Sequence, residues 1–115
     1  MAIQPIEATV RNHDGAAVID LKGEIDASGE SALNAAYASA IADKPALVML
    51  NFSGVTYMNS TGIALIVGLL AQARKQKRRL VTFGLSDHYR EIFEITRLSD
   101  FMTLYASEQA ALAGE

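Results

Sequence analysis

Apolar and polar residues alternate along this chain with two different periods, and the changes of period divide it into short elements. Residues 6–10 alternate as a strand does, and residues 16–21 form an apolar run. Between them, residues 11–15 read Arg-Asn-His-Asp-Gly and carry an Asp-Gly turn signal. Two such runs around an Asp-Gly pair predict a β-hairpin.

A helical period begins after Gly23. The spacing of three to four residues predicts an amphipathic helix, with Asp26 and Ser28 as candidate caps before it. The short apolar run at residues 46–50 predicts a central strand covered on both faces, and residues 51–59 are expected to form a loop. The apolar positions of the helix are Leu33, Ala36, Tyr37, Ala40 and Ile41.

The second half of the chain repeats the order of helix and strand. Because helices between strands act as crossover connections, the sheet should be parallel beyond the initial hairpin. The sequence therefore predicts an α/β fold, with a mixed central β-sheet and about four α-helices. The expected elements are a helix over 60–77, a strand over 80–83, a turn over 84–86, a helix over 87–96, a strand over 102–105 and a helix over 107–113.

The helix expected from Ser60 has two distinctive faces. Its larger apolar residues gather on one side, which should face the sheet. On the opposite side lie Ala64, Gly68 and Ala71, which are small where a solvated helix normally carries charge. A partner surface would explain them, and dense packing against a neighbouring helix of the same domain is the interpretation that we favour. The sheet-facing residues are Ile63, Ile66, Leu69, Leu70 and Ala73.

Composition narrows the class of protein. With 115 residues, half of them hydrophobic, the chain has the size of one domain and can bury a core without metals or disulfides. The absence of cysteine excludes disulfides and thiol chemistry, and no residue cluster calls for a cofactor. The longest apolar stretch, 63–71, is too short to span a membrane, and the first residues lack an export signal. We expect a cytoplasmic protein.

The charge balance favours a protein partner over nucleic acid. The formal net charge is −3, which disfavours non-specific attachment to phosphate backbones. Residues 74–79, Arg-Lys-Gln-Lys-Arg-Arg, are a local basic exception and offer a possible contact to phosphates. We interpret them instead as the solvated end of a helix, where cations oppose the partial negative charge of the last carbonyls.

The junction at Asn59 to Gly62 is the most informative part of the chain for chemistry. It lies just past the carboxyl end of a buried strand, where open α/β sheets place their working residues. A helix start leaves unpaired N–H groups, so Asn59 or Ser60 can act as N-cap and an anion can be held there. Taken alone, Asn-Ser-Thr before a helix is also ordinary capping sequence.

These residues resemble a family signature. In STAS domains of the anti-sigma-factor antagonists, an Asp-Ser-Ser-Gly tetrad opens the second helix, and here the tetrad reads Asn59, Ser60, Thr61, Gly62. Residues 23–26 (Gly-Glu-Ile-Asp) and 52–56 (Phe-Ser-Gly-Val-Thr) are similar to the elements before it, and residues 86–90 and 98–101 to later ones. The resemblance implies one STAS domain over residues 1–115, with a core at about 6–113.

The resemblance implies a partner switch. An unphosphorylated antagonist of this kind binds an anti-sigma factor that is itself a serine kinase, and so frees a sigma factor. The kinase then phosphorylates the first serine of the tetrad, here Ser60, with Thr61 as the alternative, and a serine phosphatase resets the switch. The implied partner-binding residues are Asp26, Asn59, Ser60, Thr61, Gly62, Ile63 and Ala64. Whether the chain forms a weak homodimer is left open.

One departure from the family pattern affects this interpretation. Asn59 stands where the antagonists usually carry Asp, so the site keeps a hydrogen-bonding side chain but lacks a carboxylate. The departure favours an alternative in which a STAS domain serves, without phosphorylation, as a scaffold of a stress-sensing complex or as an accessory subunit regulating a lipid or anion transporter.

An enzymatic role has little support in the sequence. Ser60 is not in a Gly-x-Ser-x-Gly elbow, and neither His13 nor His88 stands in a recognisable spacing with a carboxylate. The chain has no glycine-rich phosphate loop, metal-ligand motif or nucleotide fingerprint. We therefore expect a kinase substrate that catalyses no reaction itself.

Overall fold

Strands and helices alternate along the chain in the computed structural model, which describes residues 6–114. Two 3₁₀ turns, η1 (Ala27–Gly29) and η2 (Leu98–Asp100), precede α1 and β5. The strands are β1 (Glu7–His13), β2 (Ala16–Ile25), β3 (Leu47–Met58), β4 (Arg79–Phe83) and β5 (Leu104–Tyr105). The helices are α1 (Glu30–Ala40), α2 (Ser60–Lys75), α3 (Asp87–Ile95) and α4 (Glu108–Ala113).

The strands form one mixed sheet in the order β1-β2-β3-β4-β5. β1 and β2 are antiparallel, and every later pairing is parallel, so the predicted fold class is confirmed. Asp14 and Gly15 both have positive φ, 51° and 87°, which is the geometry of the tight turn that matches the twist of a hairpin.

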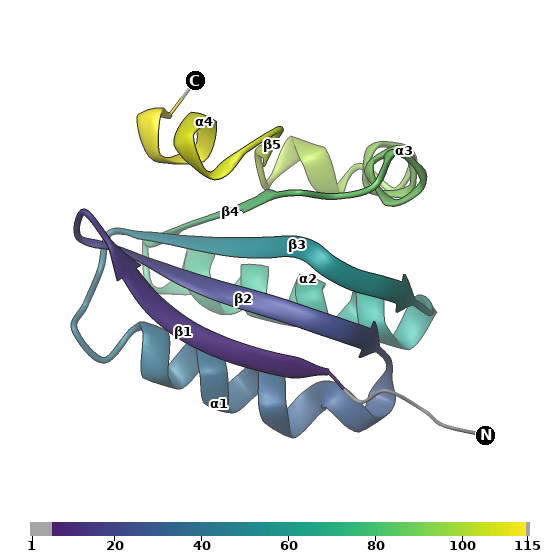
Figure 1. The fold of residues 1–115 in the computed structure, drawn as a ribbon, viewed down its shortest axis with the longest axis horizontal. Coiled ribbons are helices and arrows are strands. Elements are labelled where there is room, and N and C mark those ends of the chain that lie inside the picture. The colour runs from purple at the N-terminus through teal and green to yellow at the C-terminus, as the bar shows by residue number, and fades with distance from the viewer. Residues whose placement is uncertain (1–5, 115) are drawn as a thin grey trace.

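Helices cover the two faces of the sheet unequally (Figure 1). The larger core lies on the face covered by α1, α2 and α3, and it includes Tyr37, Ile66 and Phe93, all almost fully buried. The opposite face carries a smaller core under α4, in which Ala111 packs with residues of β2, β3 and β4. The central strands are therefore apolar on both faces, as their unbroken apolar runs predicted.

The side of α2 that was predicted to face the sheet is buried. Ile66, Leu69, Leu70 and Ala73 are buried against the sheet and Ile63 is half-buried, so the core-facing side is confirmed.

The prediction of dense packing on the other side is wrong. Ala64, Gly68 and Ala71 are exposed, and a Cβ added at Gly68 would meet nothing within 4 Å. Within residues 6–114, no neighbouring helix covers this face.

Three predicted boundaries also need correction. The loop expected at 51–59 is strand as far as Met58, because β3 continues to pair with β2 through two irregularities in register. Asp26 and Ser28 do not cap α1, whose N-cap is Gly29; Asp26 caps η1 instead. The last strand holds only Leu104–Tyr105, the stretch that pairs with β4.

A polar network ties the C-terminal helix to the first hairpin. Arg11 of β1 donates to Asp20 of β2 at 2.7 Å and to both carboxylate oxygens of Glu108 at the start of α4. His13 Nδ1 lies 2.5 Å from Glu108 Oε2. The hydrogen bond from Arg11, followed by the one from His13, lowers the pKa of Glu108 from its usual value near 4.5 to about 2. Local patterns did not predict that His13 would meet Glu108, because the two residues are far apart along the chain.

The network predicts a dependence of stability on acid. A carboxyl group whose pKa is lowered by folding stabilises the protein above its unfolded pKa, and the contribution is lost as pH falls toward the folded value. Glu108→Gln is therefore expected to cost roughly 1 kcal/mol at pH 7, with the difference vanishing between about pH 4.5 and pH 2. Urea unfolding of both proteins across this range tests it. Glu91→Gln, at an exposed position, is the matched control, and an equal loss in the control would contradict the prediction.

Candidate functional site

The carboxyl ends of β2 and β3 project together beyond the rest of the sheet. β4 pairs with β3 only as far as Asn51, whereas β2 and β3 stay paired to Ile25 and Met58. Beyond this pair, the N–H of Asn59 donates to the carbonyl of Ile25 at 3.3 Å. The chain leaves β2 through Asp26 and leaves β3 through Asn59, so both residues lie at the same edge, as expected for a working edge of an α/β sheet.

Asn59 is the N-cap of α2. Its backbone is extended, and its Oδ1 accepts a hydrogen bond from the N–H of Gly62 at 2.8 Å. Of the two candidate caps, the structure therefore selects Asn59, and Ser60 becomes the first residue of the helix. The side chains of Ser60 and Thr61 are exposed, so both hydroxyl groups face solvent at the helix end where backbone N–H groups are unpaired.

Gly62 allows the helix to start directly against the end of β2. Gly62 is buried, and a Cβ at this position would lie 2.0 Å from the carbonyl oxygen of Ile25 and 2.7 Å from its carbon. No side chain fits at such a separation from backbone atoms. The glycine thus sets how closely α2 approaches the strand, and with it the position of Ser60.

Asp26 lies at this edge, but its side chain caps the 3₁₀ turn η1 that follows it. Its Oδ1 accepts from the hydroxyl of Ser28 at 2.5 Å and from the N–H of Ser28 at 2.9 Å. These bonds, the hydroxyl's first, lower the pKa of Asp26, so it is ionised at neutral pH. Within residues 6–114, no hydrogen bond joins Asp26 to Ser60. The two residues share the edge without a hydrogen bond between them.

Tyr89 of α3 anchors the end of β3. Its buried hydroxyl accepts a hydrogen bond from the N–H of Met58 at 2.8 Å, just before Asn59. The bond links α3 to the strand end that carries the tetrad. The sequence pattern predicted a helix over 87–96 but carried no signal for this contact.

The surroundings of the tetrad are apolar and accessible. Tyr57, which sequence reasoning did not single out, is 49% exposed near the end of β3. Ile63 is half-buried and Ala64 is exposed on the first turns of α2. Tyrosine is enriched on surfaces that protein partners cover, so the exposed ring of Tyr57 makes this end of β3 a candidate contact surface.

We also searched the described residues for a metal site and for a membrane-spanning helix. Over residues 6–114, no group of three or more His, Cys, Asp or Glu side chains gathers closely enough to hold a metal ion. In the same part of the chain, no helix combines the length and apolarity needed to cross a bilayer.

Comparisons with known proteins agree with this geometry. A model of the STAS domain matches residues 7–111. The anti-sigma-B factor antagonist of Listeria monocytogenes is 35% identical over 86 residues, 75% of either chain. An anti-sigma factor antagonist from Mycobacterium paratuberculosis has a similar structure, with a TM-score of 0.83 at 25% identity over 98% of this chain and 97% of that one. The Bacillus cell fate determinant SpoIIAA in its phosphorylated form shares the fold, with a TM-score of 0.69 at 22% identity over 94% of this chain and 99% of that one.

Proposed function

Because the chain belongs to the STAS family, we propose that it is an anti-sigma-factor antagonist whose binding is switched by phosphorylation of Ser60. The observation that carries the proposal is the exposed hydroxyl of Ser60 at the first position of α2, with the cap already provided by Asn59. A kinase can reach this hydroxyl without unfolding the helix. The serine is therefore free to be modified.

The physical effect of the modification follows from its place. A phosphoserine carries a charge of about −1.5 to −2. At a helix start this charge is favourable to the fold, because it meets unpaired N–H groups and the positive end of the helix dipole. In the proposed complex the surface around Ser60, including Tyr57 and Ala64, is covered by the anti-sigma factor, and an unmatched charge there weakens binding. Release of the partner needs no change of fold.

The partners in this proposal are an anti-sigma factor with serine-kinase activity and a serine phosphatase that restores the free hydroxyl. The domain acts as a substrate and binding module, in the cytoplasm, and catalyses no reaction itself. We also propose that residues 1–115 form one STAS domain, with its core at about 6–113. Nucleic acid, membrane and cofactor have no part in it.

Intact-mass measurement tests the proposed modification. After incubation with the cognate kinase and ATP, the parent protein should gain the mass of one phosphoryl group, and Ser60→Ala should gain none. Thr61→Ala, which removes the neighbouring exposed hydroxyl, is the matched control and should be modified like the parent. Equal modification of Ser60→Ala and the parent would contradict the assignment to Ser60.

Asn59 permits a second test of the same site. If the carboxylate usual in the family aids phosphoryl transfer, Asn59→Asp should raise the rate of Ser60 phosphorylation severalfold. Stability should stay within about 0.5 kcal/mol of the parent, since Asp and Asn cap helices about equally well. The rate is read from a time course of intact mass, and the stability from urea unfolding. An unchanged or slower rate would show that the carboxylate is dispensable here.

A scaffold or transporter-accessory role without phosphorylation is the alternative, and Asn59 is the observation that favours it. The two roles differ in their gene neighbourhood and in their chemistry. A neighbouring gene for a small serine kinase or a sigma factor supports the switch, whereas transporter genes support the accessory role.

A further inference from the structure

We propose that the open edge of β4, between α2 and α4, is a docking site for an extended acidic segment of a partner protein. This edge lies at the other end of α2 from Ser60. Fourteen residues of helix at about 1.5 Å each place Arg74 roughly 20 Å from Ser60. The proposed site is therefore separate from the surface at the tetrad.

The edge is open because β5 is shorter than β4. β5 pairs with β4 only at Thr82 and Phe83, which leaves residues 79–81 without a paired strand on that side. The N–H of Thr82 donates to the carbonyl of Thr103 at 3.1 Å, so Thr82 turns its backbone groups toward β5. By the alternation of a strand, Leu80 turns its N–H and C=O the same way, to the unpaired part of the edge. Leu80 and Val81 are only 3% and 2% exposed, so a bound segment contacts this edge chiefly through the arginines on either side of it.

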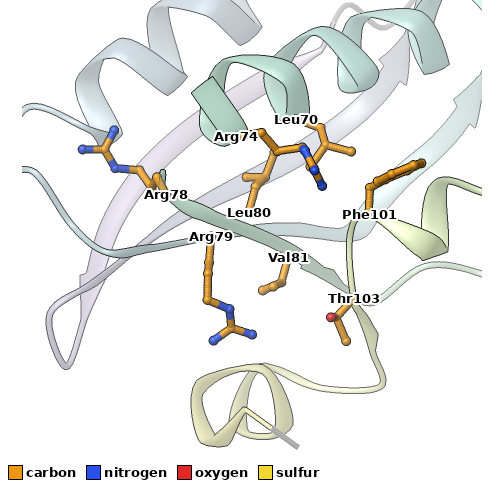
Figure 2. Close-up of a pocket in the computed structure, with 8 residues that line it drawn as sticks. All are labelled: Leu70, Arg74, Arg78, Arg79, Leu80, Val81, Phe101 and Thr103. Carbon is orange, nitrogen blue, oxygen red and sulfur yellow. The ribbon is translucent and has the colours of Figure 1, made fainter. Parts of the chain in front are cut away.

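Basic side chains stand on both sides of this edge. Figure 2 shows Arg74 on the α2 side of β4, and Arg79 on the α4 side together with Val81 and Thr103. The pocket along the edge has a volume of about 200 Å³. Arg74 lies over the ring of Phe101, 5.1 Å from its centroid. Because successive side chains of an extended peptide point to opposite faces, neighbouring acidic residues can reach one arginine each.

The charges of Arg74 and Arg79 are available for a partner. Over residues 6–114, no carboxylate lies within 4.0 Å of either side chain, and both are exposed. Arg78 is different, because it donates to the carbonyl of Pro45 at 2.7 Å and to Gln76 at 2.8 Å. Charged residues at an edge also discourage pairing between copies of a protein. With an arginine on each side of the β4 edge, an acidic segment is attracted and a basic segment is repelled.

An apolar groove continues from the pocket and argues for a protein segment. It shares Leu70, Arg74 and Phe101 with the pocket and has a volume of about 310 Å³. Phe101 and Val67 are 57% and 41% exposed along it. A free phosphate would contact the arginines alone, whereas a peptide with an apolar residue beside its acidic ones also fills the groove. Nucleic acid is disfavoured by the net charge of −3.

Fluorescence anisotropy with defined probes tests the proposal. The probe is a short labelled peptide with consecutive glutamates and one leucine, and its matched control has glutamine at each glutamate. The acidic peptide should bind the parent at least about tenfold more tightly, and the difference should shrink as salt rises. In an amide spectrum of the protein, the resonance of Leu80 should shift on titration.

Charge-reversal variants locate the site. Arg74→Glu and Arg79→Glu should each weaken binding of the acidic peptide about five- to tenfold. Lys22→Glu makes the same change of charge at an exposed position on β2 and should stay within about twofold of the parent. Thermal melts should match the parent for Arg79→Glu and Lys22→Glu, since both residues are exposed, and Arg74→Glu should melt only slightly lower, because it puts a negative charge in the last turn of α2 and removes the contact with Phe101. Ser60→Asp should bind the peptide like the parent, so failure here is distinguishable from failure of the Ser60 switch.

Four outcomes would overturn the proposal. Equal binding of the acidic and glutamine peptides removes the role of charge, and equal weakening by Lys22→Glu removes the assignment to this edge. Inorganic pyrophosphate binding as tightly as the peptide makes the pocket a small-anion site. Tighter binding of an oligonucleotide makes the basic run a nucleic-acid contact.

Discussion

Phosphorylation of Ser60 is expected to lower the affinity for the cognate anti-sigma factor by at least about 30-fold. An unmatched charge buried in an interface typically costs about 2 to 5 kcal/mol, and each ~1.4 kcal/mol is tenfold in affinity. Ser60→Asp should weaken binding less, because one carboxylate has a smaller charge than a phosphate. Ser60→Ala should keep the affinity of the unmodified parent and hold it in the presence of ATP.

The fold should be unaffected by these changes. Because Asn59 provides the cap, removal of the Ser60 hydroxyl leaves the bond to Gly62 intact. All three proteins should therefore melt close to the parent, and Asn59→Ala, which removes the cap itself, should cost about 1 kcal/mol.

Calorimetric titration of each protein with the anti-sigma factor measures the binding, and thermal melts measure the fold. Thr61→Ala serves as the control for loss of an exposed hydroxyl on the same turn. Equal binding of the parent, its phosphorylated form and Ser60→Asp would reduce Ser60 to an exposed helix residue, and the scaffold role would then replace the switch.

Gly62→Ala is expected to lower the free energy of unfolding by about 3 kcal/mol. The added Cβ would lie 2.0 Å from the carbonyl oxygen of Ile25, and backbone atoms cannot swing aside as a flexible side chain can. Inserting a methyl group into a packed region typically costs about 1 to 3 kcal/mol, and a backbone contact places this variant at the upper end. Since the helix start must move, phosphorylation of Ser60 should slow as well.

Gly68 offers a matched control on the same helix. It is exposed, and a Cβ there would meet nothing within 4 Å. Gly68→Ala should therefore raise the free energy of unfolding by roughly 0.5 to 1 kcal/mol, because alanine loses less backbone entropy in a helix than glycine does. Urea unfolding of both variants beside the parent checks the pair. A change of under about 0.5 kcal/mol in Gly62→Ala would contradict the close approach of α2 to β2.

Local patterns were sufficient for most of the fold. The Asp-Gly signal gave the hairpin, and the 3.6-residue period of the larger apolar residues gave the buried side of α2, because each depends on neighbours in the chain. The strand beyond Asn51 escaped detection for the opposite reason. Its polar residues lie on a ladder with β2 that only the folded sheet creates, and Phe52 and Met58 are buried there by elements far along the chain.

Some features of the candidate site could likewise be predicted from local sequence, and others depend on the tertiary structure. The position of Ser60 at the start of a helix was readable from residue types, since capping residues and apolar periodicity are local signals. The choice of Asn59 as cap and the close approach at Gly62 depend on where the helix lies against β2. The bond from Met58 to Tyr89 depends on α3, which follows much later in the sequence.

The sequence by itself determined the elements, their order and the residues that the family signature marks. Only the tertiary structure decided which charges meet and which faces stay open. Arg11, His13 and Glu108 come together because the parallel topology brings α4 back over the first hairpin. Arg74 and Arg79, close in the basic run, separate to the two sides of an open strand edge because α2 ends and β4 begins between them. Hydrophobic periodicity depends only on residues that are close together in the sequence. Burial and strand pairing depend on segments that are far apart in the sequence and that the topology of the fold brings together.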